Sequence, residues 1–135
     1  MTVLIDTNVI LDILLKREPF FSDSYEAVKK LAVDDSVCMV SASAATDIFY
    51  LLRRGLNSSS KAKDSMERLL QLVDFVNVLS IDIQAALADS ITDFEDAVVH
   101  ALAARNQADY IITRNTKDFK GSVIPVVTPK EFLGM

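Results

Sequence analysis

The sequence predicts an α/β fold of three layers, in which helices cover both faces of a parallel sheet. The expected strands are continuous apolar runs, as strands that are buried on both faces require. Segments with apolar residues at helical spacing lie between them, which is typical of a parallel sheet with crossover helices. The chain of 135 residues has the length of one compact domain. We therefore expect a single domain over residues 1–135.

Five strands are expected, each a run of apolar and β-branched residues that ends at polar or turn residues. They cover residues 2–5, 37–40, 76–81, 109–113 and 123–127.

The helices are expected from apolar spacing and from start and stop signals. Ser22 or Asp23 can cap a helix that runs through Leu31, and Gly55 is expected to end the next one. Residues 57–60 form the only linker-like segment, which is too short to divide domains. The other expected helices cover residues 9–15, 44–54, 61–73, 83–90, 93–106 and 129–133.

Composition limits the class of protein. Half of the residues are hydrophobic and 24% are charged, so the chain can build a core. Cys38 is the only cysteine, which excludes an internal disulfide, favours a reducing compartment and suggests core packing for this side chain. The N-terminus lacks the basic residues of a signal peptide, and no apolar run is long enough to span a membrane. We expect a soluble cytoplasmic protein.

The charge balance is acidic, with 19 Asp and Glu against 14 Lys and Arg and a formal net charge of −5. Proteins that hold nucleic acid by bulk electrostatics usually carry a basic surplus. Two bound divalent cations would contribute about four positive charges and nearly cancel the surplus of acids. The balance therefore argues against tight nucleic-acid binding without metal, but not against metal-assisted cleavage.

Acidic and polar residues follow several of the expected strands. Ligands of parallel sheets bind beyond the carboxyl ends of the strands, and the helix over residues 93–106 must begin at that same edge. Four segments send side chains there, namely Asp6, then Ser41, Ser43 and Asp47, then Asp93 and Asp96, and finally Thr113, Arg114, Asn115 and Asp118. The topology thus predicts a cluster of carboxylates at one edge.

Carboxylates that are gathered in one place repel one another, and a divalent cation removes that cost. Mg²⁺ and Mn²⁺ prefer oxygen ligands and retain several waters, so a few carboxylates and a substrate phosphate complete their shell. Two such ions can activate a water and stabilise the leaving oxygen in phosphodiester cleavage. The acids therefore indicate metal-assisted phosphoryl chemistry.

Three motifs make the sequence resemble the PIN-domain family. They are Asp-Thr-Asn at residues 6–8, Asp-Phe-Glu-Asp-Ala at residues 93–97, and Ile-Thr-Arg-Asn-Thr-Lys-Asp-Phe at residues 112–119. The resemblance extends over essentially the whole chain. It implies a five-stranded parallel sheet of order 3-2-1-4-5 and a Mg²⁺- or Mn²⁺-dependent ribonuclease whose products keep a 5′-phosphate. Many standalone members are VapC-type toxins, which are often homodimers and are inhibited by a small antitoxin.

The resemblance also assigns residues. It implies that Asp6, Asp47, Asp96 and Asp118 are the catalytic metal-binding acids, and Asp93 is a further candidate ligand. At position 47 the family usually has Glu, so this chain has a carboxylate that is one methylene shorter. The polar residues that are expected to support the acids are Asn8, Thr113 and Asn115.

Several of these residues also have structural interpretations. Asp93 can cap its helix, and Thr92 with Glu95 fits a capping box. His100 follows Asp96 by one helical turn, and we expect it to be a solvated or partner-facing residue rather than a general base. Basic residues that could contact an RNA backbone are Arg53, Arg54, Lys61 and Arg114.

Three other classes of protein share features with this sequence. An aspartyl-nucleophile phosphatase also has Asp after the first strand, but it typically has a second acid where this chain has Asn8. A receiver domain needs paired acids near that strand, which are absent, and no Gly-rich phosphate loop is present among three glycines. A degenerate PIN module that only binds RNA or protein is favoured by Asp47 in place of Glu.

Overall fold

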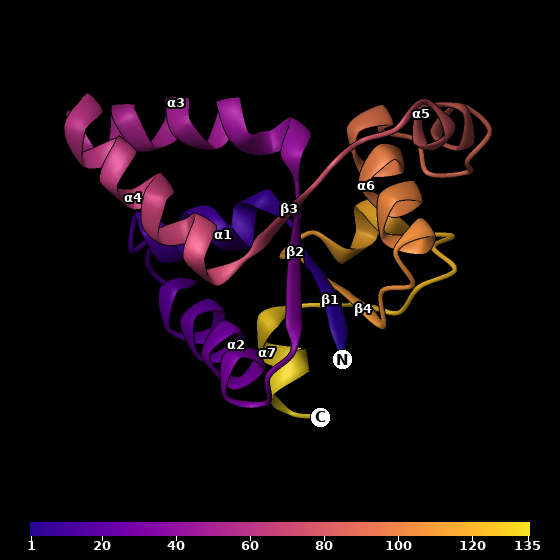
Figure 1. The fold of residues 1–135 in the computed structure, drawn as a ribbon. Coiled ribbons are helices and arrows are strands. Elements are labelled where there is room, and N and C mark those ends of the chain that lie inside the picture. Colours follow the sequence, from indigo (N-terminus) through magenta and orange to yellow (C-terminus); the bar gives the residue numbers. More distant parts are fainter.

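The computed structural model describes all residues 1–135 and has a five-stranded sheet at its centre (Figure 1). All pairings are parallel, and the order is β3-β2-β1-β4-β5. The sequence prediction of a three-layer fold and of this strand order is therefore confirmed. The strands are β1 (Thr2–Ile5), β2 (Val37–Ser41), β3 (Asp74–Val76), β4 (Tyr110–Ile112) and β5 (Val126–Val127).

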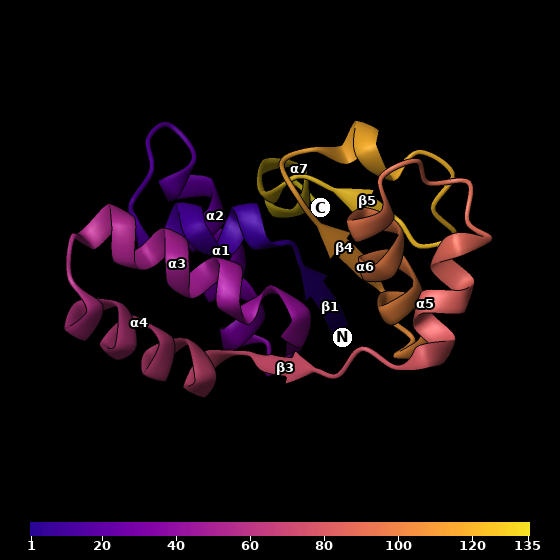
Figure 2. The same ribbon diagram turned by 90° about the horizontal axis from the view of Figure 1, so that it is seen from above.

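Helices cover both faces of the sheet (Figures 1 and 2). One face packs against α1 (Thr7–Leu14), α2 (Phe21–Val33), α3 (Ala45–Leu56), α4 (Ser59–Leu72) and α7 (Pro129–Leu133). The other face packs against α5 (Ser80–Leu87) and α6 (Phe94–Arg105). Two short 3₁₀ turns, η1 (Ala42–Ala44) and η2 (Thr116–Phe119), follow β2 and β4 at the carboxyl edge.

The strands bury side chains on both faces, which explains their continuous apolar sequences. In β1, Val3 and Ile5 belong to the core under α1 to α4, whereas Leu4 belongs to the core under α5 and α6. The same alternation separates Cys38 from Met39 in β2. Successive side chains of a strand point to opposite faces, so both faces need apolar residues when both are covered. The thiol of Cys38 is part of the core, as expected.

The third and fifth strands are shorter than the sequence predicts. We expected a strand over residues 76–81, but β3 ends at Val76 and α5 begins at Ser80. The carboxylate of Asp82 accepts a hydrogen bond from the N–H of Leu79 at 2.9 Å, which caps the helix. In the expected strand over residues 123–127, the Ser122 hydroxyl bonds both the N–H and the carbonyl of Ile124. These bonds replace ladder hydrogen bonds.

The prediction that Gly55 ends its helix is wrong, because α3 continues through it to Leu56. A Cβ atom at Gly55 would lie 2.6 Å from Cδ2 of Leu15, so glycine permits close approach of α3 to the end of α1. The helix ends at Asn57, whose φ of 52° is left-handed. The hydroxyl of Ser58 then accepts from the N–H of Lys61 and starts α4. No helix combines the length and the hydrophobicity that crossing a membrane requires.

Candidate active site

Carboxylates from four segments lie at the carboxyl edge of the sheet, the side from which Figure 2 is seen. Asp6 follows β1, and Asp47 lies in the first turn of α3. Asp96 lies in the first turn of α6, and Asp118 lies in η2 after β4. The charges of Asp6 and Asp118 both raise the pKa of Asp96, so the carboxylates of these segments interact electrostatically.

Asp6 is held in one orientation by neighbouring groups. Its Oδ1 accepts from the N–H of Thr7 at 2.8 Å, which makes it the cap of α1. Its Oδ2 accepts from the hydroxyl of Thr113 at 2.8 Å and from Nδ2 of Asn8 at 3.3 Å. Burial raises the pKa of Asp6 more than these hydrogen bonds lower it. The hydrogen bonds thus fix the orientation of the carboxylate, and the charge of Arg114 offsets only part of the cost of burying it.

The expected supporting residues connect Asp6 to the segment after β4. Thr113 is fully buried, and its hydroxyl also accepts from the N–H of Asn115 at 3.1 Å. Asn8 donates to that same hydroxyl at 3.3 Å and accepts from the N–H of Arg114 at 3.2 Å. Asn115 therefore contributes through its main chain, whereas Asn8 and Thr113 contribute through side chains.

Asp96 has the most altered acidity in the cluster. Burial is the largest cause, followed by the charges of Asp6, Asp93, Asp118 and Glu95, and together they raise its pKa from 3.8 to about 7. Asp93 caps α6, because its Oδ1 accepts from the N–H of Asp96 at 3.0 Å. The structural interpretation of Asp93 thus holds, and its charge still acts on the cluster.

Glu95 belongs to the cluster, which the sequence did not indicate clearly. Burial raises the pKa of Glu95 most, and the charges of Asp47, Asp93 and Asp6 raise it further. The proposed capping box with Thr92 is wrong, because Asp93 is the cap residue. The only sequence signal was that Glu95 directly precedes Asp96 in the second motif. Asp47 is exposed on α3. Its charge raises the pKa of Glu95, which links Asp47 to the cluster.

Arg114, expected as a contact for the RNA backbone, makes an ion pair with a buried carboxylate. Its Nε lies 2.6 Å from Oδ2 of Asp12, a fully buried residue of α1 that the sequence analysis did not single out. The guanidinium also stacks over the ring of Phe20, 4.0 Å from the ring centre. Arg114 thus joins the segment after β4 to α1.

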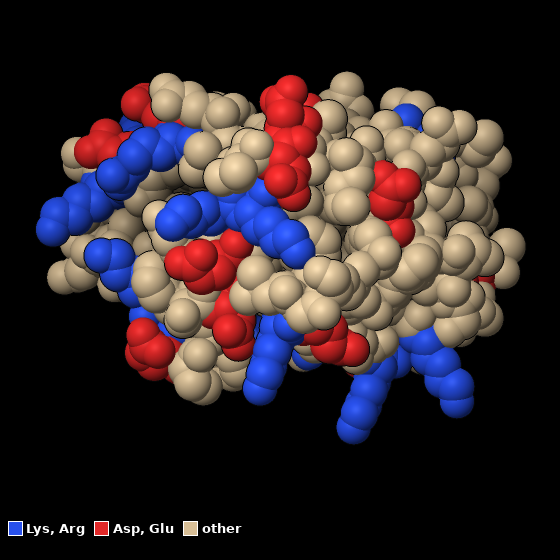
Figure 3. Space-filling view, turned by 90° about the horizontal axis from the view of Figure 1, so that it is seen from below, with Lys and Arg blue, Asp and Glu red and all other residues tan.

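The other basic candidates lie away from the acids. Arg53 and Arg54 are exposed in the last turn of α3, about 10 Å along the helix from Asp47 at 1.5 Å per residue. Nε of Arg53 donates to the hydroxyl of Ser59, and Lys61 is exposed in the first turn of α4. On the side opposite the acid cluster, Lys and Arg alternate with Asp and Glu without forming one basic patch (Figure 3).

His100 is buried, so the expectation of a solvated or partner-facing residue is wrong. Its side chain is 8% exposed, and its Nδ1 lies 2.6 Å from Oδ2 of Asp89. The N–H of Val123 donates to its Nε2 at 3.1 Å, so Nδ1 carries the proton that is shared with Asp89. His100 therefore joins α6 to the segments before α6 and before β5, and it is not a solvent-accessible base.

The chemistry of the cluster fits a divalent cation. All its donors are carboxylate oxygens, and burial together with the charges of neighbouring carboxylates raises the pKa values of Asp96, Asp6 and Glu95. No three His, Cys, Asp or Glu side chains are already arranged as a set that could hold a metal ion. Mg²⁺ keeps several waters and is usually bound by one or two carboxylates, so the residues fit a hydrated ion rather than a protein cage.

Comparison with known proteins identifies the family. The family model of the PIN domain matches residues 2–117, and the chain therefore belongs to the PIN-domain family. No curated protein matches the sequence.

Solved structures contain chains with the same fold, and one of them is a toxin–antitoxin complex. A chain of VapBC2 from Rickettsia felis, bound to a DNA fragment from its promoter, aligns with a TM-score of 0.74, 15% identity, and coverage of 94% of this chain and 97% of that chain. A chain of FitAcB from Neisseria gonorrhoeae aligns with a TM-score of 0.67 and 20% identity, over 95% of this chain and 98% of that chain. A chain of a toxin–antitoxin complex from Klebsiella pneumoniae aligns with a TM-score of 0.65 and 21% identity, over 94% of this chain and 97% of that chain.

Proposed function

We propose that this PIN domain is a metal-dependent nuclease that hydrolyses RNA phosphodiester bonds. The observation that carries the proposal is the gathering of carboxylates at the carboxyl edge of the sheet, where burial, followed by the charges of Asp6, Asp93, Asp118 and Glu95, raises the pKa of Asp96 to about 7. Such a concentration of acid destabilises a folded protein unless a cation offsets the charge. Carboxyl groups with altered pKa values also cluster at functional sites. The residues that would hold Mg²⁺ or Mn²⁺ are Asp6, Asp47, Asp93, Asp96 and Asp118, with Glu95 beside them.

A bound ion would supply water activation and neutralise charge that develops on the phosphate. The chain itself orients the oxygens. Thr7 and Thr113 fix the two oxygens of Asp6 by hydrogen bonds of 2.8 Å each. Asp93 holds the first turn of α6, which places Asp96. With no cation present, Asp96 retains its proton up to about pH 7, and it must release that proton when an ion binds.

The test is cleavage of pooled RNA by the purified protein with Mg²⁺, with Mn²⁺ and with a chelator. Asp6→Asn should lower kcat/KM at least about a hundredfold, because a metal contribution to the transition state is worth several kcal/mol. Asp64→Asn, an exposed carboxylate on α4, is the matched control and should keep full activity. Cleavage that survives the chelator, or the Asp6 variant, would contradict the metal mechanism.

A second candidate function is that of a degenerate PIN module that binds RNA or protein without cleavage. Exposed Asp47 and the lack of a preassembled ligand set favour it. Absence of cleavage under every condition, together with binding of RNA or a partner, would support this candidate. Acid-labile phosphate on Asp6 would instead support the phosphatase.

We further propose that the protein is a cytoplasmic toxin that forms a homodimer and is inhibited by a small antitoxin. The resemblance of the sequence to VapC-type toxins and the structural similarity to chains of VapBC2 and of a toxin–antitoxin complex from Klebsiella pneumoniae support this. The exposed apolar side chains of Ile81 and Leu87 on α5, and of Leu70 and Leu72 on α4, supply surface for a second copy or a partner. Growth arrest on expression that is relieved by a small neighbouring reading frame would support the toxin role, and size-exclusion chromatography tests the dimer.

A further inference from the structure

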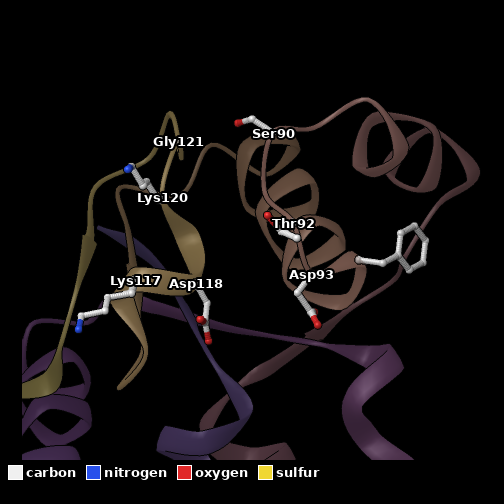
Figure 4. A pocket seen from close by; sticks show the side chains of 8 residues that line it. Ser90, Thr92, Asp93, Lys117, Asp118, Lys120 and Gly121 are labelled. Atoms are coloured by element: carbon white, nitrogen blue, oxygen red, sulfur yellow. The ribbon is translucent and has the colours of Figure 1, made fainter.

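A polar groove of about 900 Å³ adjoins the acid cluster. One wall is the segment before α6, with Ser90 and Thr92, and the other wall is η2 and the residues after it, with Lys117, Lys120 and Gly121. In Figure 4, Asp93 and Asp118 point toward the same end of the groove, while Ser90 and Gly121 lie at the other end. The groove therefore begins at the proposed catalytic acids and leads away from them.

The groove has a defined shape, because buried contacts hold its two walls. His100 bonds Asp89, which precedes Ser90, and it accepts from the N–H of Val123, which follows the η2 wall. At the far end, a Cβ atom on Gly121 would lie 2.6 Å from the hydroxyl of Ser90, and the φ of Gly121 is +95°. The walls thus meet there, and only glycine allows the approach.

The lining distinguishes this groove from the basic residues selected from the sequence. Only one lining residue is hydrophobic, and the volume lies in the range of small-molecule sites. Lys117 and Lys120 are both exposed, and their side chains extend from the η2 wall away from α6 (Figure 4). The rest of the lining consists of the hydroxyl groups of Ser90 and Thr92, the carboxylates of Asp93 and Asp118, Phe94 and main chain, while positive charge stands along one rim.

We propose that this groove holds the nucleotide next to the scissile phosphate, and that Lys117 and Lys120 bind the adjoining phosphates of a single-stranded RNA. The proposal rests on the nuclease function proposed above. A strand whose scissile phosphate lies at the acids carries its next nucleotide into the groove and its backbone over the lysine rim. The ammonium groups of Lys117 and Lys120 attract the RNA phosphates and offset their repulsion by the nearby carboxylates. A duplex could not place one base in a groove closed at its far end.

The first experiment measures binding and cleavage of a short single-stranded RNA by the double variant Lys117→Ala/Lys120→Ala. KM should rise about tenfold with kcat within about twofold, because the lysines bind substrate without contacting the reacting atoms. The logarithm of the RNA association constant should depend less steeply on the logarithm of the salt concentration. The slope should decrease in magnitude by about 0.7 to 1.4, for one or two lost phosphate contacts. Lys117→Arg/Lys120→Arg should restore both values, and Lys29→Ala, an exposed lysine of α2, should change neither.

The basic residues at the end of α3 and the start of α4 are the competing candidates for RNA binding, and the variant Arg53→Ala/Lys61→Ala tests them. An effect on the salt slope as large as that of the Lys117/Lys120 variant, or larger, would overturn the proposal. So would an unchanged KM and salt slope in the Lys117/Lys120 variant of an active enzyme. If the wild-type protein cleaves nothing but its RNA binding depends on Lys117 and Lys120, the nuclease proposal fails, while binding of RNA phosphates by the two lysines is supported.

The second experiment uses the single, buried cysteine of the chain. Cys38 is 6% exposed, so Thr92→Cys creates the only accessible thiol, inside the groove. Saturating single-stranded RNA should slow alkylation of that thiol at least about fivefold, whereas a thiol introduced by Lys29→Cys should react at an unchanged rate. Equal protection by duplex RNA, or no protection at RNA concentrations that saturate binding, would contradict occupation of the groove by one unpaired nucleotide. A DNA strand of the same sequence tests whether the sugar is recognised.

Discussion

At the scale of single residues, Asp96 shows most clearly how neighbours change chemistry. In the unfolded chain its carboxyl group ionises near pH 3.8, and in the folded protein near pH 7. Between these values the folded state binds more protons than the unfolded state, so folding stability falls as the pH rises. The carboxyl groups of Asp82 and Asp89 have lowered pKa values and act in the opposite direction, but below about pH 4.

We predict that the metal-free protein loses stability between pH 5 and pH 8. The loss should be about 1–2 kcal/mol in the free energy of unfolding, allowing for screening at this partly exposed carboxyl group. Urea denaturation in chelator at both pH values measures it. Asp96→Asn should remove most of the difference, and Asp64→Asn should retain it. A wild-type difference that persists in Asp96→Asn would show that another group is responsible.

At the scale of elements, buried polar pairs fix the segments that carry the site. The pair of Asp12 and Arg114 joins α1 to the segment after β4, at an Nε to Oδ2 distance of 2.6 Å. Arg17 lies 3.9 Å from the same carboxylate. Removal of one partner from a buried pair leaves an uncompensated charge, which costs far more than the pair contributes.

We predict that Arg114→Ala lowers the free energy of unfolding by about 3 kcal/mol, because the fully buried Asp12 loses its closest partner. Asp12→Leu/Arg114→Met, which removes both charges, should recover much of the loss. Chemical denaturation measures both variants. If Arg114 bound RNA instead, Arg114→Ala would leave stability unchanged and reduce the salt slope of RNA binding.

The second pair, His100 with Asp89, joins α6 to the walls of the groove. Burial alone would raise the pKa of Asp89, but hydrogen bonds from His100 and from main-chain N–H groups outweigh it and lower that pKa. We predict that His100→Leu costs about 2–4 kcal/mol, because Asp89 and the N–H of Val123 lose their partner. The Gln side chain of His100→Gln can donate to Asp89 and accept from the N–H of Val123. Chemical denaturation should therefore show that this variant recovers part of the lost free energy of unfolding. A His100→Leu variant as stable as wild type would contradict this role.

At the scale of the whole molecule, acidity and metal binding are linked. The formal charge of −5 includes at least six acids at one edge of the sheet, namely Asp6, Asp47, Asp93, Glu95, Asp96 and Asp118. A ligand that binds only the folded state stabilises it, by about 2.7 kcal/mol at a hundred times its Kd.

We predict that saturating Mg²⁺ or Mn²⁺ raises the Tm by several degrees, and more at pH 8 than at pH 5, where protons compete with the ion for Asp96. Differential scanning fluorimetry with and without chelator measures the shift. Asp6→Asn should abolish it, whereas Asp64→Asn should leave it intact. An unchanged Tm in saturating metal would argue against the carboxylate cluster as a cation site.

The resemblance carried by the three motifs implied the strand order. The alternation of strands and helices determined the edge at which the acids gather. A residue directly after a buried parallel strand must lie at the carboxyl edge, so Asp6 and Thr113 could be placed without coordinates. Tertiary structure decided which groups touch. Nearly every side of α6 is apolar, so its sequence did not show that His100 is buried, and the ends of β3 and α5 depended on the cap by Asp82.

The same distinction holds for substrate binding. Arg53, Arg54 and Arg114 were all basic candidates in the sequence, but the length of α3 separates Arg53 and Arg54 from the acids, and Arg114 forms an ion pair with Asp12. The groove beside Lys117 and Lys120 depends on two loops that meet only because Gly121 packs against Ser90. Backbone periodicity places residues along an element, whereas contacts between loops depend on packing over long sequence separations, which no local pattern encodes.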